Sequence, residues 1–260
     1  SPICLTLSSG EVWGEKPQLS QNSSKAISQT IASPFYRKDN IKDEYTLLTL
    51  NFKKQWGVEF RVYNDGVAYR FVNKRTKGFT IAGEEVAYNF GNDVTTVVPY
   101  VMYGKDGDYE SQFHTSFENT YTVDKLSKLN KERLMFLPLV AETPGGKKIC
   151  ISESDLESYP GLFLTNTKGN HSLTGVFAPY PRSSELGGHN MLQFRVTGRE
   201  PYIAKVNGPR TFPWRMAIIT TKDKELADSD MTYKLGAPSR VSDISWIKPG
   251  KVAWDWWNDW

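Results

Sequence analysis

The sequence predicts an all-β protein, a sandwich of antiparallel sheets with few short helices. Apolar and polar residues alternate with a period of two along many short runs. Clusters of Gly, Asn, Asp and Pro separate these runs, and segments with helical spacing are rare. Many short strands at close spacing are typical of a sandwich, and 260 residues provide enough chain for one large domain or two small ones.

The clearest predicted element is a β-hairpin between residues 57 and 72. Apolar and polar side chains alternate along 57–63 and again along 67–72. The turn sequence Asn64-Asp65-Gly66 lies between the two runs, and Asp-Gly in that position is a strong hairpin signal. We expect Gly66 to supply the positive φ that the tight turn needs.

Other runs predict strands at residues 45–52, 78–82, 135–139, 148–152, 162–165, 191–196 and 215–220. One helix is predicted over residues 221–227, where a threonine cap precedes good helix formers. Residues 122–134 fit two patterns, a helix or a strand followed by a basic loop, and the sequence leaves both open.

The composition excludes several classes of protein. The net charge is only +3 and no Lys/Arg block is present, so a dedicated polyanion binder is excluded. No apolar run approaches the ~18 residues that would span a bilayer. Aromatic residues make up 13% of the chain, which excludes a disordered chain.

The two cysteines do not indicate a metal or redox site. Cys4 and Cys150 form no CxxC pair, so zinc-ribbon and thioredoxin chemistry lack support. Cys150 falls within an apolar strand pattern and is expected to be a buried small hydrophobe. Pairing between the two cysteines stays open, because spacing alone cannot decide it.

Tryptophan is concentrated at the end of the chain. Five of the eight tryptophans fall within residues 246–260. Four of them lie within the last nine residues, and four exposed indoles would invite association. We therefore expect residues 251–260 to be the first strand of a second domain, and residues 1–250 to form the first domain. The chain begins at Ser1 without Met, so we also expect that an upstream leader has been removed.

These segments resemble a known family. The run VAWDWWNDW at 252–260 resembles the opening strand of the catalytic barrel in glycoside hydrolase family 97. Residues 64–71, the run 151–156 that leads into Tyr159-Pro160-Gly161, and Pro213-Trp214-Arg215 resemble that family's amino-terminal domain. The resemblance covers essentially the whole chain in the same order.

The resemblance implies a fold, an activity and a location. Members hydrolyse α-linked glucosides or galactosides, use calcium, and are periplasmic or extracellular. Their amino-terminal domain is a β-super-sandwich related to the galactose-mutarotase fold, packed on a (β/α)₈ barrel. The general acid and the base or nucleophile lie in that barrel, so we expect no catalytic residue in this chain and no hydrolysis by this chain alone.

The resemblance also implies one calcium ligand. In the family, the amino-terminal domain lends one glutamate to the calcium site, and the matching position is Glu153. Carboxylate oxygens are ligands that Ca²⁺ prefers, although one carboxylate alone makes a poor site. Asp155 and Glu157 lie close in sequence, so the ligand's identity stays open, and the whole run also fits a solvated turn. Tyr159 fits core or turn packing better than sugar stacking.

The remaining candidates lie in the tail and at the histidines. By the resemblance, Asp255, Trp257 and Asn258 are expected to contact substrate at the mouth of the barrel, although the indoles also fit packing at a domain junction. None of the three histidines has a partner at i+3 or i+4, so a zinc-binding helix is not indicated. Of these, His114 and His189 are expected in loops.

Three functions are consistent with the sequence. The first is the amino-terminal domain of a family 97 glycosidase, which braces the barrel, walls the substrate pocket and supplies one calcium ligand. The second is a stand-alone carbohydrate-binding module that uses the exposed tryptophans. The third is a mutarotase-like enzyme, which would need a histidine and a carboxylate that face each other in a sugar-sized pocket.

Overall fold

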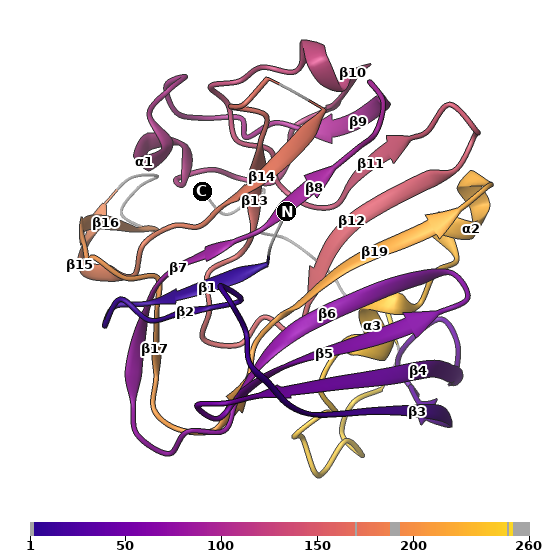
Figure 1. Ribbon diagram of the computed structural model, residues 1–260. Helices are drawn as coiled ribbons and strands as arrows, with labels where there is room; N and C mark the ends of the chain where they lie inside the picture. Colours follow the sequence, from indigo (N-terminus) through magenta and orange to yellow (C-terminus); the bar gives the residue numbers. More distant parts are fainter. Residues whose placement is uncertain (1–2, 170, 188–192, 249, 252–260) are drawn as a thin grey trace.

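The protein consists of two facing layers of antiparallel strands (Figure 1). The computed structural model describes residues 3–169, 171–187, 193–248 and 250–251. Every strand pair in these ranges is antiparallel, which confirms the predicted all-β sandwich. Within the same ranges, no helix has the length and apolar character required to cross a membrane.

One layer is a large sheet, which has ten strands in the described part of the chain. Its order is β10 (Tyr121–Lys125), β9 (Thr95–Pro99), β11 (Leu139–Glu142), β12 (Lys148–Ser154), β19 (Trp214–Thr220), β6 (Gly66–Asn73), β5 (Trp56–Tyr63), β4 (Asn40–Phe52) and β3 (Leu19–Ala32), with β18 (Arg210–Thr211) paired to β6. Strands far apart in sequence are therefore neighbours at its centre, where β12 and β6 flank β19.

Smaller sheets form the other layer and a projecting hairpin. The first sheet has the order β17 (Ala204–Val206), β7 (Phe79–Glu85), β1 (Cys4–Leu7) and β2 (Val12–Trp13). The second has the order β13 (Phe163–Thr165), β14 (Ser172–Val176) and β8 (Ala87–Asn89). The hairpin pairs β15 (Pro181–Gly187) with β16 (Gln193–Arg199).

The helices of the described chain are short. They are α1 (Tyr109–Gln112), the 3₁₀ turn η1 (Leu126–Lys128), α2 (Asp223–Ala227) and α3 (Met231–Leu235). The helix predicted over residues 221–227 is confirmed as α2, but the predicted threonine cap is wrong, because the helix begins at Asp223 and its N-cap is Lys222. Residues 122–134, for which two patterns were open, form the end of β10, then η1 and a loop.

The core lies between the two layers. Trp13 of β2 and Trp56 of β5 stack across the layers, with ring centroids 5.4 Å apart and an interplanar angle of 6°. Phe71 and Phe212 surround the same indoles. Aromatic pairs in such contact contribute about 0.5–1.5 kcal/mol each beyond the area they bury, so this cluster fixes how the layers meet.

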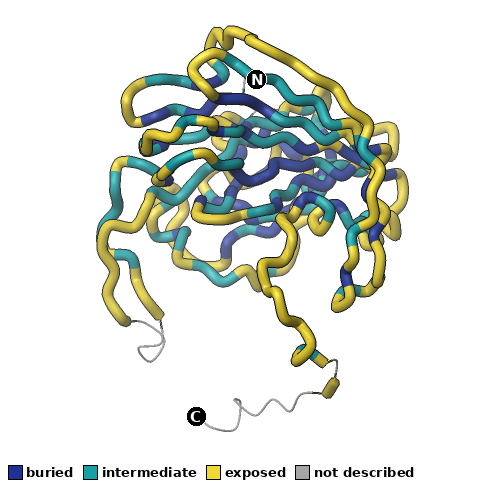
Figure 2. Tube along the Cα trace, turned by 90° about the horizontal axis from the view of Figure 1, so that it is seen from below, coloured by how far each residue is buried: buried dark blue, intermediate teal, exposed yellow. Residues whose placement is uncertain are grey.

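The large sheet is also covered on its outer face. Met231 and Leu235 of α3 pack there against Trp214, Met216 and neighbouring side chains. Both faces of the central strands are therefore buried, which makes β12 and β19 a rigid place to hold a functional side chain. Figure 2 shows the buried strands at the centre, while the exposed segment after α3 runs away from the body of the protein.

The predicted hairpin is confirmed, but the expected role of its glycine is wrong. β5 and β6 pair from Trp56 opposite Asn73 to Tyr63 opposite Gly66. Neither Asp65 nor Gly66 has a positive φ. Gly66 is required for another reason, because a Cβ there would lie 2.4 Å from the Ala217 carbonyl oxygen of β19.

The strand predicted at residues 135–139 is largely wrong. Met135 makes only isolated bridges, and β11 starts at Leu139. A cis peptide bond joins Leu137 to Pro138 between them. The run is apolar because Leu134, Met135, Phe136 and Leu139 are all buried, and burial alone does not specify a strand.

Candidate functional site

Glu153 lies near the end of β12 and points between the two layers. Side chains alternate along a strand, and Ile151 packs in the core between the layers. Ser154 belongs to the opposite face, where its Oγ donates to the Thr232 carbonyl of α3 at 2.8 Å. The strand register places Glu153 directly opposite Arg215 of β19.

Arg215 connects Glu153 to the other layer. Its Nε and Nη2 donate to the two carboxylate oxygens of Glu84 in β7, at 2.9 and 2.7 Å. Its Nη1 donates to Oε2 of Glu153 at 2.5 Å. The guanidinium also lies over the rings of Tyr159 and Phe177, 5.7 and 5.0 Å from their centroids. This bidentate and stacked geometry suits arginine and not lysine.

This network is buried and carries an excess of negative charge. The Arg215 side chain is 1% exposed, Glu84 is 4% exposed and Glu153 is 15% exposed. Two carboxylates share one guanidinium, so one negative charge remains when all three groups are ionised. Burial raises the pKa of Glu153, while Arg215 and the backbone N–H of Leu162 act in the opposite direction.

The turn after β12 completes the network. Asp155 and Ser158 have positive φ values of 61° and 50°, which bend the chain sharply back toward the core. Tyr159 is 8% exposed, and its hydroxyl donates to Oε2 of Glu84 at 2.8 Å. Leu162, beyond the turn, donates its N–H to Oε1 of Glu153 at 3.0 Å. The packing interpretation of Tyr159 is therefore confirmed.

Glu153 fits a calcium ion as one ligand among several. Each of its carboxylate oxygens accepts one hydrogen bond and retains further lone-pair capacity. The uncompensated negative charge of the network favours a cation, and Glu153 is its most exposed member. Among the described residues, no three His, Cys, Asp or Glu side chains gather to hold a metal, so most of the oxygen ligands that Ca²⁺ requires would have to come from elsewhere.

The two other acidic residues of this run have separate partners. Asp155 accepts the backbone N–H of Ala237 at 3.1 Å, and its other oxygen lies 3.7 Å from Arg70. Glu157 is 58% exposed and pairs with Arg240 at 2.9 Å. Only Glu153, of these three carboxylates, belongs to the network between the layers.

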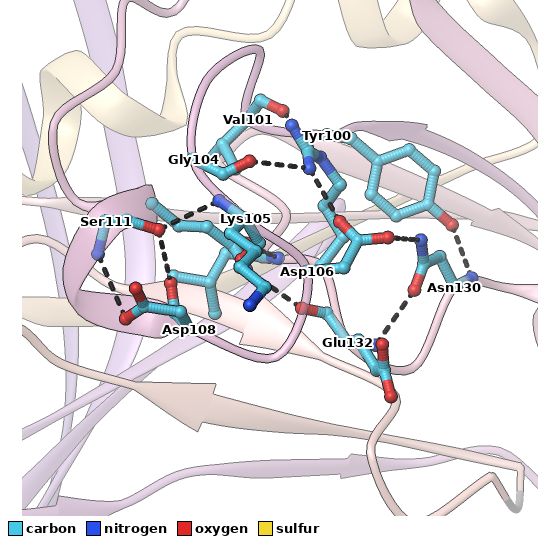
Figure 3. A network of polar contacts seen from close by, with 12 residues as sticks. Tyr100, Val101, Gly104, Lys105, Asp106, Asp108, Ser111, Asn130 and Glu132 are labelled. Atoms are coloured by element: carbon cyan, nitrogen blue, oxygen red, sulfur yellow. Dashed lines mark hydrogen bonds and ion pairs between the residues drawn. The ribbon is translucent and has the colours of Figure 1, made fainter.

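Three acidic turn residues outside this network have structural partners. Figure 3 shows Asp106 accepting from Asn130 at 3.0 Å, and Asp108 capping α1 through the N–H of Ser111 at 3.3 Å. Arg133 also donates to Asp106, and hydrogen bonds from Arg133 and Asn130 lower the pKa of the Asp106 carboxyl. Asp93 likewise accepts the N–H and hydroxyl of a single serine.

The predicted substrate contacts Asp255, Trp257 and Asn258 lie outside the described residues, as do His189 and the strand predicted at 252–260. Trp246, the first of the terminal tryptophans, is 71% exposed. His114 lies 3.9 Å from Glu110, and both side chains are largely exposed. That pair does not form the enclosed sugar pocket that a mutarotase-like enzyme requires.

The two cysteines are separate free thiols. Cys4 lies in β1 of the smaller layer and Cys150 lies in β12 of the large sheet, and both are buried. Burial raises the pKa of Cys150 to about 11. Spacing left the pairing of these cysteines open. In the structure they do not form a disulfide bond.

Sequence reasoning did not find Glu84 as a partner of the site. In β7, Ile81 pairs with Leu7, and Gly83 pairs with the preceding residue of β1, so Ala82 is an extra residue that forms a β-bulge. The bulge changes which face each later side chain occupies, and Glu84 therefore points inward although it lies three residues after the buried Ile81. Strict alternation predicts the opposite orientation.

Two solved structures share this fold. A glycoside hydrolase family 97 enzyme from Pseudoalteromonas sp. strain K8, in complex with acarbose, superposes with a TM-score of 0.74 at 18% identity, over 95% of this chain and 34% of that one. A β-arabinopyranosidase superposes with a TM-score of 0.65 at 18% identity, over 85% of this chain and 34% of that one.

The family itself follows from the sequence comparison. The model of the glycosyl hydrolase 97 N-terminal domain matches residues 1–238, and the chain belongs to this family. It is 60% identical to a retaining α-galactosidase of Bacteroides thetaiotaomicron over all 260 residues, which is 39% of that protein's length. It is also 24% identical, over 212 residues, to a probable retaining α-galactosidase of Streptomyces bingchenggensis, covering 79% of this chain and 27% of that protein.

Proposed function

We propose that this chain is the amino-terminal domain of a retaining glycosidase that acts on α-galactosides. The observation that carries the proposal is the 60% identity to a retaining α-galactosidase across the whole chain. Because the chain spans only 39% of that relative, the catalytic groups are assigned to the part of the protein that follows. α-Glucosides are the alternative substrate class, since a more distant structural relative at 18% identity was solved with panose.

In this proposal, the domain braces a catalytic barrel, walls one side of the substrate pocket and contributes Glu153 to a shared calcium site. The ion would supply positive charge beside the bound sugar when it is present. Arg215 and the Leu162 N–H hold the carboxylate of Glu153 in one orientation, and Glu84 holds Arg215 from the opposite layer. The ligand is therefore positioned before any ion arrives.

Hydrolysis with retention requires two carboxylates about 5–5.5 Å apart, one as nucleophile and one as acid and base. In this proposal, both carboxylates belong to the barrel, so this chain supplies shape, charge and orientation. We expect the purified 260-residue chain to show no turnover of nitrophenyl α-galactoside, while the longer protein that contains it hydrolyses this substrate. Turnover by the 260-residue chain would overturn the assignment.

The calcium role has a separate test. In the longer protein, Glu153→Gln is expected to weaken calcium binding at least tenfold, measured by isothermal titration after treatment with EGTA, because a charged ligand is replaced by a neutral amide. Glu157→Gln is the matched control. Glu157 follows β12 in the same acidic run, but it pairs with the exposed Arg240. Calcium affinity in Glu153→Gln equal to that of the unaltered protein would remove Glu153 from the site, and a loss confined to Glu157→Gln would assign the ligand to Glu157.

A further inference from the structure

A second candidate site lies at the edge of the smaller layer, beside β17. A surface cleft of about 460 Å³ opens there, within the range of small-molecule sites. Ile203, Lys205 and Asn207 alternate along this edge, so their side chains share the face that lines the cleft. Tyr180, between Pro179 and Pro181, also lines the cleft. Tyr159 also lines the cleft, and its hydroxyl donates to Glu84 of the Glu153 network.

The ring of Tyr180 gives the cleft an exposed aromatic surface. Its side chain is 38% exposed, and the ring of Tyr202 supports it at a centroid distance of 5.5 Å and an angle of 36°. The backbone fixes this position, because Tyr180 N–H donates to the Tyr202 carbonyl at 2.8 Å and Glu200 N–H donates to the Tyr180 carbonyl at 2.8 Å. A ligand would therefore meet an aromatic surface that needs little further ordering.

Polar groups lie close to the same ring. The Lys205 ammonium lies over both tyrosine rings, 5.2 Å from the centroid of Tyr180 and 5.6 Å from that of Tyr202, and it hydrogen-bonds to the Tyr202 side chain. Asn207 follows on the same face and brings an amide that both donates and accepts hydrogen bonds. Arg199 holds the wall in place, because its Nη1 donates to the Pro179 carbonyl at 2.7 Å and its Nε pairs with Glu110.

A pyranose ring matches these features. Its axial C–H groups form an apolar face that stacks on a tyrosine, and its rim of hydroxyls pairs with an ammonium and an amide. We propose that this cleft binds a pyranose unit of an oligosaccharide, with Tyr180 beneath the sugar ring and Lys205 and Asn207 bonded to its hydroxyls. The three proposed sugar contacts do not include Glu153 and require no metal.

The test uses the 260-residue chain with raffinose and panose as probes, in EDTA. Saturation-transfer NMR should show transfer to the sugar protons, and titration should shift the backbone amides of Tyr180 and Lys205. Tyr180→Ala is expected to lower the affinity about tenfold, as loss of a stacking anchor does. Lys205→Met keeps the aliphatic stem and removes the donors, and it is expected to lower the affinity about threefold.

The matched control is Tyr233→Ala. Tyr233 is 40% exposed and packs against Tyr36 with centroids 4.9 Å apart at an angle of 31°, so it copies the Tyr180 pair elsewhere on the surface. Sugar binding should be unchanged in this variant. Absence of binding by the unaltered chain, or equal affinity in the Tyr180, Lys205 and Tyr233 variants, would overturn the proposal.

The Lys205→Met and Asn207→Ala variants decide the question if Tyr180→Ala fails to fold, because both residues are exposed. Failure of this proposal leaves the proposed glycosidase role untouched, since turnover and calcium binding are measured on other groups.

Discussion

Two clusters of ion pairs in this protein use the same chemistry in opposite surroundings. Arg215 binds Glu84 and Glu153 between the layers, where its side chain is 1% exposed. Arg37 pairs with Asp228 and Asp230 near the surface, where its own side chain is 39% exposed, that of Asp228 is 69% exposed and that of Asp230 is 9% exposed. Burial decides what each cluster contributes, because a buried charge without a partner is costly while water and salt replace an exposed one.

The largest effect is expected from Arg215→Met. The substitution fills much of the space but leaves Glu84 and Glu153 buried without their cation. Removal of one partner from a buried pair destabilises a protein by about 3–5 kcal/mol, so the free energy of unfolding should fall by that amount. Urea denaturation followed by tryptophan fluorescence measures it. A loss below about 1 kcal/mol would show that the two clusters are equivalent and would break the comparison.

A smaller effect is expected from Glu153→Gln, about 1 kcal/mol, because Arg215 keeps its bidentate partner Glu84. The pH dependence sharpens this prediction. Burial raises the pKa of Glu153, so between its unfolded and folded pKa values the unfolded chain binds fewer protons. Stability from this group is greatest below its unfolded pKa of about 4.3 and falls as pH rises toward the folded value.

Denaturation of the unaltered chain and of Glu153→Gln at several pH values above 4 checks this sign. The stability advantage of the unaltered chain should shrink as pH rises. A growing advantage would mean that the Arg215 charge outweighs burial and that the pKa of Glu153 is lowered.

The Cys150 thiol tests burial on the other face of β12, where α3 covers the large sheet. Burial raises the pKa of Cys150 to about 11, so little thiolate exists at neutral pH and access is restricted. We expect neither Cys150 nor the buried Cys4 to react with Ellman's reagent in the folded chain, and both to react in urea. Rapid reaction of one thiol without urea would show that its side of the sandwich opens locally.

The smallest effect is expected from Arg37→Met, the surface counterpart of Arg215→Met. The urea midpoint should stay close to that of the unaltered chain, because water replaces the pair with the exposed Asp228, while Asp230 keeps its contacts with Lys38 and the Tyr36 hydroxyl. Raising the salt concentration should leave the two midpoints equally close. A large loss would assign this cluster a structural role in joining the β3–β4 turn to the segment between α2 and α3.

Local patterns predicted much of the large sheet, because alternation and turn residues report burial on one face. β5 and β6 are clear examples, and Asn64-Asp65 forms their turn. β3 had no such signal: its 14 residues are mostly polar and exposed, and pairing with β4 holds this edge strand in place. Its structure depends on a neighbouring strand and not on its own side chains.

The candidate site was predictable only in part. Glu153 came from a resemblance to a family motif, and Arg215 was visible within the same resemblance without a stated role. Their pairing depends on strand register across β12 and β19, which sequence spacing does not encode. Glu84 depends on the irregular pairing of β7 with β1, a property of the backbone and not of residue type.

The bulge at Ala82 therefore preserves the charge of the interior. Because the pairing skips Ala82, Ile81 and Glu84 lie opposite Leu7 and Leu5 of β1, and both side chains face the same side of the sheet. If β7 continued in strict alternation through Ala82, the Glu84 carboxylate would turn outward to water and Arg215 would keep Glu153 as its remaining partner in the network. The surplus negative charge beside the proposed ion site would then disappear, so one irregular pairing in the smaller layer determines whether the centre of this domain attracts a cation.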